Sequence, residues 1–225
     1  MFHDRTQAGR VLGRLVATSV TDQPLIVLAL PRGGVPVGFE VAKATHAAVF
    51  DIFLVRKLGV PGQEELAFGA IASGGTRVLN RTVIGQSGID DETIEQVTEE
   101  ERAELERRER LYREGRPSLD LRDRTVVLVD DGLATGATML AAVQAARLQN
   151  PKDVIVAVPV ASHEARKDLS RVADQVICAE VPHHFSAVGC WYRDFDQITD
   201  REVRDLLGRF RTPSNTPHNA LQTPG

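Results

Sequence analysis

Two adjacent aspartates and the small loop behind them are the clearest chemical feature of the sequence. Asp130 and Asp131 follow the run 125–129, TVVLV, which is apolar or β-branched, and the segment 132–138, GLATGAT, leads into a helical apolar pattern. A Gly- and Thr-containing loop at a strand-to-helix turn suits phosphate, because backbone N–H groups and the positive end of the helix face the anion. Carboxylates only accept hydrogen bonds, so a neighbouring pair suits vicinal hydroxyls. The stretch therefore predicts a sugar 5-phosphate as the ligand.

The sequence motifs of other ligand-binding loops match this segment less well. A Walker A loop requires Lys after its last glycine, and Ala137 follows Gly136. Neither GLATGA nor RGGVPVG spells a dinucleotide fingerprint, and a calcium loop alternates its acids. A plain Asp-Asp-Gly turn before a capped helix remains an alternative. We favour phosphate binding by the five residues of the loop, which are Ala134, Thr135, Gly136, Ala137 and Thr138.

The segment 130–138, DDGLATGAT, placed after a hydrophobic strand, resembles the phosphoribosyl pyrophosphate (PRPP) motif of type I phosphoribosyltransferases. The resemblance implies that Asp130 and Asp131 bind the ribose 2- and 3-hydroxyls as part of the catalytic site, and that the loop binds the 5-phosphate. It also implies Mg²⁺ as the cofactor, held by the same two aspartates through water.

Two further segments carry the same resemblance. LALPRGGVPVG (28–38) resembles the family's pyrophosphate loop, where an unusual backbone conformation turns amides toward the leaving group. FLVRKLGVPG (53–62) ends the second expected strand and resembles the Arg-Lys segment of adenine and xanthine phosphoribosyltransferases. Either cationic segment alone could be a solvated charge, but three anion-suited turns follow three strands. The predicted pyrophosphate ligands are Arg32, Gly33, Gly34, Arg56 and Lys57.

The acceptor side is less defined. Ala134 stands where hypoxanthine-guanine enzymes carry an Asp, and adenine enzymes also have Ala there. Glu65, or its neighbour Glu64, is the candidate replacement as general base, although surface glutamates are common. A hood over 181–200 is expected to bind the acceptor, with a packed aromatic corner as the alternative. Its candidate contact residues are Phe185, Val188 and Tyr192.

The elements that must position these residues alternate between strand and helix. The expected strands are 25–30, 49–55, 125–130, 153–160 and 175–181, and the helical stretches between them are 37–48, 137–150 and 162–173. This alternation predicts an α/β fold with a doubly wound parallel sheet, which binds ligands at the carboxyl ends of its strands. We expect one domain over 1–210, interrupted by a charged, largely solvated helical insertion at 90–116, and a disordered tail at 211–225.

Composition and charge limit the classes of partner that the chain is expected to bind. The chain has 225 residues, of which 26% are charged, and its formal net charge is -4. Nucleic-acid-binding domains are usually basic, so this charge does not indicate nucleic-acid binding. The first ten residues lack the apolar core of a signal peptide, and the nearby apolar run LIVLALP is too short to cross a bilayer. We expect a cytoplasmic homodimer with no nucleic-acid or membrane partner.

The resemblance and the residues together predict an Mg²⁺-dependent enzyme that transfers 5-phosphoribosyl from PRPP to a nitrogenous acceptor, which could be a nucleobase, and releases pyrophosphate. The alternative is a non-catalytic protein that senses PRPP or a nucleotide with the same fold. The acidic balance weighs against a DNA-binding regulator of that kind. A nucleotide hydrolase is a third hypothesis, for which the sequence offers no paired nucleophile and base.

Overall fold

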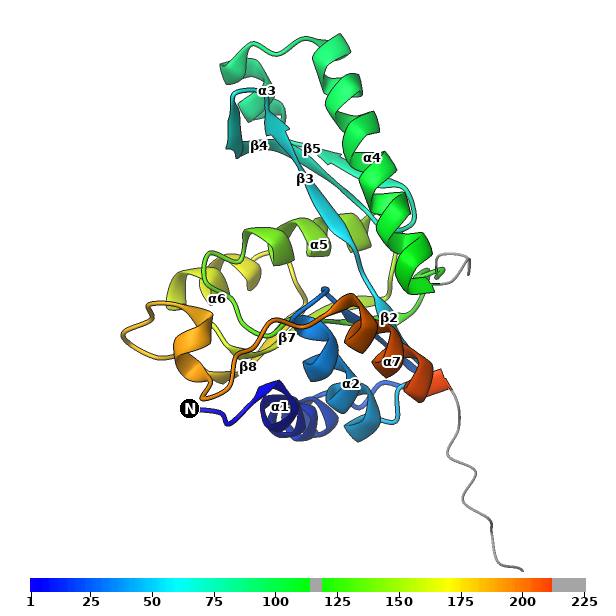
Figure 1. Cartoon of the computed structure of the whole chain (residues 1–225), viewed down its shortest axis with the longest axis vertical. Helices are drawn as coiled ribbons and strands as arrows, with labels where there is room; N and C mark the ends of the chain where they lie inside the picture. Colours follow the sequence, from blue (N-terminus) through cyan, green and yellow to red (C-terminus); the bar gives the residue numbers. More distant parts are fainter. Residues whose placement is uncertain (114–118, 212–225) are drawn as a thin grey trace, which may run out of the picture.

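The structure is a computed structural model that describes residues 1–113 and 119–211, drawn in colour in Figure 1. The predicted disordered tail and the end of the predicted insertion lie outside the described residues, apart from Arg211. Five parallel strands form the main sheet in the order β2-β1-β6-β7-β8. Their bounds are Val49–Ile52 (β2), Leu25–Ala29 (β1), Thr125–Val129 (β6), Asp153–Val160 (β7) and Gln175–Glu180 (β8).

The predicted parallel sheet is confirmed, and all five expected strands belong to it. Each residue of β1 and β6 is buried, as expected of strands covered on both faces. The two strands are neighbours in register, with Leu25 opposite Thr125 and Ala29 opposite Val129. The chain segments that follow Ala29 and Val129 therefore emerge side by side at the carboxyl edge of the sheet.

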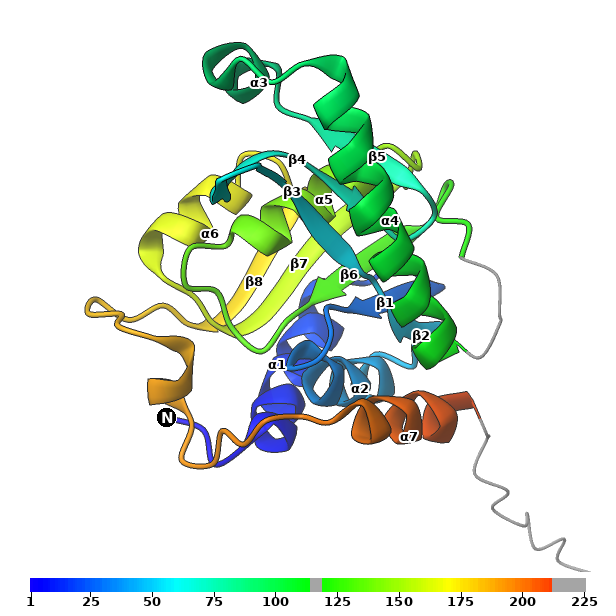
Figure 2. The ribbon, with the colours of Figure 1, turned by 45° about the horizontal axis from the view of Figure 1, so that its top comes forward.

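Helices cover both faces of the main sheet (Figure 2). One face carries α1 (Arg5–Ser19), α2 (Gly34–Ala44) and α7 (Asp200–Arg211), and the other carries α5 (Ala137–Arg147) and α6 (His163–Leu169). The apolar side chains of each face form a separate buried cluster. This layering fixes the strand ends, and with them the loops that carry the predicted site.

A second sheet corrects the prediction for the second strand. The expected strand 49–55 leaves the main sheet at Ile52, and an antiparallel sheet follows with the order β3-β4-β5. Its strands are Val55–Val60 (β3), Gln63–Ala72 (β4) and Thr76–Leu79 (β5). The buried residues Phe53 and Leu54 join the two sheets without a polar break, so the sequence carries no mark of the change. Figure 1 shows the second sheet stacked over α5.

The charged segment after the second sheet is helical, as expected, but it is less solvated than expected. Helices α3 (Arg81–Ser87) and α4 (Asp91–Arg113) follow β5, and α4 packs along β3 and β4 (Figure 1). Three side chains of α4 itself are buried, those of Ile94, Leu105 and Tyr112. At its end Arg113 is buried against Asp51 of β2, with 3.3 Å between Nε and Oδ2. Helix α4 thus joins the second sheet to the first.

The expected hood, 181–200, contains a single 3-10 turn, Val188–Trp191 (η1), and returns beside the start of the chain. Phe2 and Tyr192 form an isolated parallel bridge, and the Phe2 N–H donates to the Trp191 carbonyl oxygen at 2.7 Å. Across the residues that the structure describes, none of the helices has the length and apolar character required to cross a bilayer.

Candidate active site

The two aspartates and the two glycines of the predicted pyrophosphate loop meet where β6 and β1 end. The Asp131 N–H donates to Asp130 Oδ1 at 2.8 Å. A Cβ atom on Gly33 would lie 2.1 Å from Asp131 Oδ2, and one on Gly34 would lie 2.7 Å from the Val129 carbonyl oxygen. The loop therefore approaches the acids more closely than any residue with a side chain permits. The peptide bond between Pro31 and Arg32, just before these glycines, is cis.

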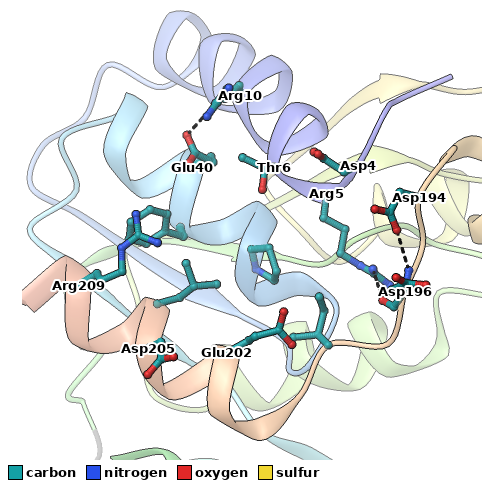
Figure 3. A pocket seen from close by; sticks show the side chains of 14 residues that line it. Asp4, Arg5, Thr6, Arg10, Glu40, Asp194, Asp196, Glu202, Asp205 and Arg209 are labelled. Atoms are coloured by element: carbon teal, nitrogen blue, oxygen red, sulfur yellow. Dashed lines mark hydrogen bonds and ion pairs between the residues drawn. The ribbon is translucent and has the colours of Figure 1, made fainter.

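Arg5 is a site residue that the sequence analysis missed. Its Nε donates to Asp131 Oδ2 at 2.8 Å, and its Nη1 donates to the Asp196 carbonyl oxygen at 2.8 Å. Figure 3 shows the side chain reaching from the start of α1 to the 194–196 segment. The sequence analysis predicted no helix at the start of the chain, so it gave no local signal for Arg5, the first residue of α1.

Charge at the acid pair is only partly compensated within the protein. Burial, and next the neighbouring Asp131 charge, raise the pKa of Asp130 well above its ordinary range. Burial also raises the pKa of Asp131, and the hydrogen bond from Arg5 opposes that rise. Two half-buried carboxylates beside one guanidinium leave a place for further positive charge.

A divalent cation fits this donor set. Mg²⁺ in proteins is commonly held by one or two carboxylates, water and substrate phosphates. Among the described residues no group of three or more His, Cys, Asp or Glu side chains could hold a metal ion by itself. Asp130 and Asp131 would therefore share the ion with oxygens of a bound ligand.

The predicted phosphate loop lies open at the start of α5. Ala134, Thr135, Ala137 and Thr138 are exposed, and Gly136 takes a left-handed conformation (φ 72°) at the N-cap. A hydrogen bond holds the backbone of the loop in place: the Ser162 hydroxyl donates to the Ala134 carbonyl oxygen at 2.7 Å. The first turn of a helix leaves N–H groups without intrahelical partners. A phosphate group could bind to these donors and the two threonine hydroxyls.

Arg32 points from the pyrophosphate loop toward the junction of α4 and α7. Its Nη1 lies 3.8 Å from Asp200 Oδ1, and the Tyr112 hydroxyl donates to the same Asp200 oxygen at 2.5 Å. Burial, and then the hydrogen bond to Asp200, raise the pKa of Tyr112 to about 12. Arg32 is exposed, so it remains available to an anionic ligand.

The structure does not keep Arg56 and Lys57 together as a pair of pyrophosphate ligands. They occupy neighbouring positions of β3, so their side chains leave opposite faces of the second sheet. Arg56 Nε donates to Glu101 Oε2 of α4 at 2.5 Å. Lys57 lines a cavity of about 450 Å³ together with Arg81 and Ala137 of the phosphate loop. Lys57 alone of the two therefore faces the phosphate end of α5.

The candidate general bases lie at the turn between β3 and β4. Glu64 is exposed, and its Oε1 accepts a hydrogen bond from the Gly62 N–H at 3.1 Å. Glu65 is a residue of β4, and its side chain lies outside the described part of the structure.

The three candidate residues of the hood have different surroundings. Tyr192 is buried, its hydroxyl donates to the Asp131 carbonyl oxygen at 2.6 Å, and its ring packs between Phe2 and Phe195. Tyr192 therefore supports the Asp131 backbone, in place of the acceptor contact expected from the sequence. Val188 lies against Gly132, where a Cβ atom would be 2.5 Å from Val188 Cγ1, and Phe185 is half-buried.

Comparisons with known proteins identify the family to which the chain is related. A model of the phosphoribosyl transferase domain family matches residues 2–193. Two strains of Mycobacterium tuberculosis, CDC 1551 and H37Rv, encode proteins provisionally named phosphoribosyl transferases that are 45% identical over 209 residues, or 93% of this chain. The chain spans about half of their length, 47%. A crystal structure of a protein from Thermus thermophilus matches with a TM-score of 0.83 and 42% identity, over 92% of this chain and 97% of that one.

Proposed function

Because this chain belongs to the phosphoribosyl transferase family, we propose that it transfers the 5-phosphoribosyl group of PRPP to a nitrogenous acceptor and releases pyrophosphate. One observation carries the proposal: Gly33 and Gly34 lie against Asp130 and Asp131, while the open 134–138 loop begins the helix that follows these acids. Groups suited to pyrophosphate, ribose and 5-phosphate thus follow one another along the edge of a single sheet.

Each part of the donor has proposed partners. The 5-phosphate binds the exposed loop of Ala134, Thr135, Gly136, Ala137 and Thr138. The ribose hydroxyls donate to Asp130 and Asp131. The amides of the glycine loop and the Arg32 guanidinium bind the pyrophosphate, since a planar fork of donors matches phosphate oxygens. Lys57, which faces the start of α5, adds a second cation when the donor is bound.

The transfer replaces the bond between ribose C1 and a pyrophosphate oxygen with a bond between C1 and the acceptor nitrogen. Positive charge develops on the ribose ring as the leaving group departs, so residues that hold the ring in place and attract the pyrophosphate promote the step. When bound, Mg²⁺ would neutralise pyrophosphate charge, and Asp130 and Asp131 would hold it through water. Glu65 remains the proposed base, and Phe185 and Val188 the proposed rim of the acceptor site.

Calorimetric titration of PRPP with Mg²⁺ tests the donor assignment. We expect saturable binding by the natural chain and its loss in the Asp130→Asn/Asp131→Asn variant, because an amide at each position removes the negative charge. Asp168→Asn/Asp205→Asn is the matched control, since these acids make exposed ion pairs on α6 and α7. A natural chain that binds no PRPP would rule out the proposal.

Turnover is tested separately with radiolabelled PRPP and a panel of purines, pyrimidines and other amines. Pyrophosphate release that depends on one acceptor supports the enzyme, and donor binding without turnover on the whole panel supports a sensor. The homodimer and the cytoplasmic location expected from the sequence also stay proposals. Light scattering of the purified chain and fractionation of cells test them.

A further inference from the structure

We propose that Arg5 is a positioning residue that orients the Asp131 carboxylate toward the ribose hydroxyls of the donor. The inference rests on the proposed function and extends it to a residue far away in the sequence. Arg5 is the first residue of α1, whereas Asp131 lies two residues beyond the end of β6, and their side chains are only 10% and 15% exposed. A buried, charge-assisted contact across that separation has a definite geometry.

The Arg5 guanidinium is fixed on three sides. Its Nε bonds to Asp131, its Nη1 bonds to the Asp196 carbonyl oxygen, and its flat face lies 3.8 Å from the Phe195 ring centroid. The nearby Glu202 lines the same cavity as Arg5, but its carboxylate accepts from the Thr199 N–H and hydroxyl, each at 2.7 Å. Glu202 is thus engaged elsewhere, and Arg5 is directed to Asp131.

The contact also distinguishes the two carboxylate oxygens of Asp131. Oδ2 accepts from Arg5 and lies closest to Gly33, while Oδ1 lies farther from that glycine. The Tyr192 hydroxyl holds the main chain of the same residue. Asp131 is therefore fixed by Arg5 at its side chain and by Tyr192 at its backbone, and we expect Oδ1, which accepts no bond from Arg5, to receive a ribose hydroxyl.

Asp130 provides an internal contrast. Its Oδ1 accepts from the Asp131 amide, a bond that needs no other part of the chain. Two carboxylates this close repel one another, and the Arg5 cation compensates one of them from within the protein. Loss of Arg5 should therefore disturb Asp131 and the hydroxyl that it binds, and should leave the 134–138 loop intact, because Arg5 makes its hydrogen bonds to Asp131 and Asp196.

Binding of ribose 5-phosphate and of inorganic phosphate, each with Mg²⁺, tests the role. In Arg5→Ala we expect about 10- to 100-fold weaker binding of ribose 5-phosphate, by analogy with the loss of a hydrogen-bond partner that orients a metal ligand. Binding of inorganic phosphate, which needs only the 134–138 loop, should stay unchanged. Arg5→Lys should lie between, because it keeps the charge but loses the fork.

Arg10→Ala is the matched control, since Arg10 lies on the same helix and its exposed side chain pairs with Glu40 at 3.5 Å. Equal loss of both ligands in folded Arg5 variants would indicate a purely structural role and overturn the inference, as would unchanged binding of both. If Arg5→Ala does not fold, Arg5→Lys and Phe195→Leu give the same comparison. A natural chain that binds phosphate but no ribose 5-phosphate would instead overturn the proposed function, and the inference with it.

Discussion

At the residue scale, the contact between Gly33 and Asp131 leaves no room for a side chain at position 33. A methyl group at Gly33 would overlap Asp131 Oδ2, at 2.1 Å. We expect Gly33→Ala to displace the carboxylate, to abolish measurable ribose 5-phosphate binding, and to cost about 1–3 kcal/mol of unfolding free energy. Calorimetry and urea unfolding measure the two effects.

Gly85→Ala is the control for that substitution. Gly85 lies in α3 with no atom within 4 Å of an added Cβ, so alanine should leave binding unchanged and stabilise the helix by up to about 1 kcal/mol. Normal ribose 5-phosphate binding by Gly33→Ala would show that the loop moves freely away from the acids.

The two cysteines should differ in reactivity. Burial raises the pKa of Cys178 to about 11, and Cys190 is exposed. Only the thiolate is nucleophilic, so Cys178 stays protonated and slow at pH 8, and its rate rises as the pH approaches 11. Iodoacetamide labelling followed by mass spectrometry of each peptide measures both rates, and Cys190→Ser isolates the slow site. Equal rates at pH 8 would contradict the prediction.

Local motifs made part of the site predictable. The acids and their loop occupy one continuous segment, 130–138, and the structure keeps them in the predicted strand-to-helix turn. Arg5 contacts Asp131 across 126 positions, a pairing that no local pattern encodes. Tyr192 was noticed for its aromatic ring, but its hydroxyl bond to Asp131 depends on the packing of Phe2 and Phe195.

At the element scale, a buried ion pair connects helix α4 to the main sheet. The side chains of Arg113 and Asp51 are 3% and 9% exposed, and Arg113 also donates to the Ile52 carbonyl oxygen at 3.0 Å. Arg113→Ala removes the guanidinium from a buried carboxylate, which we expect to cost about 3–5 kcal/mol of unfolding free energy. Chemical denaturation measures the change.

The control lies on the same helix. Arg102 pairs with Glu99 at the surface of α4, so Arg102→Ala should cost no more than about 1 kcal/mol. Similar costs for the two substitutions would mean that α4 is held by its apolar contacts with β3 and β4 rather than by this ion pair.

The helices and strands differed in how readily they could be predicted from the sequence. Long apolar runs identified all five parallel strands. The second sheet was missed because glycines and charges interrupt its alternation, and because its register shifts on both sides of Gly59. The charges of α4 predicted a helix correctly, but they concealed how much its few apolar residues bury.

At the scale of the whole molecule, donor binding should stabilise the fold. A ligand that binds only the folded state at 100 times its Kd adds about 2.7 kcal/mol. For a chain of this size that corresponds to a rise in Tm of about 5–10 °C. Thermal unfolding with PRPP and Mg²⁺ measures the rise, and Asp130→Asn/Asp131→Asn should show none. An equal rise in that variant would place the binding site elsewhere.

The neighbouring positions of β1 and β6 have a consequence for how such a chain can diversify. Their loops meet at the acids, yet the second sheet and α4 are built from the chain between them. Insertions or exchanges within 55–113 can therefore accumulate while the two strand ends keep their register. We therefore expect the paired ends of β1 and β6 to tolerate less change than the exposed positions of the segment between them.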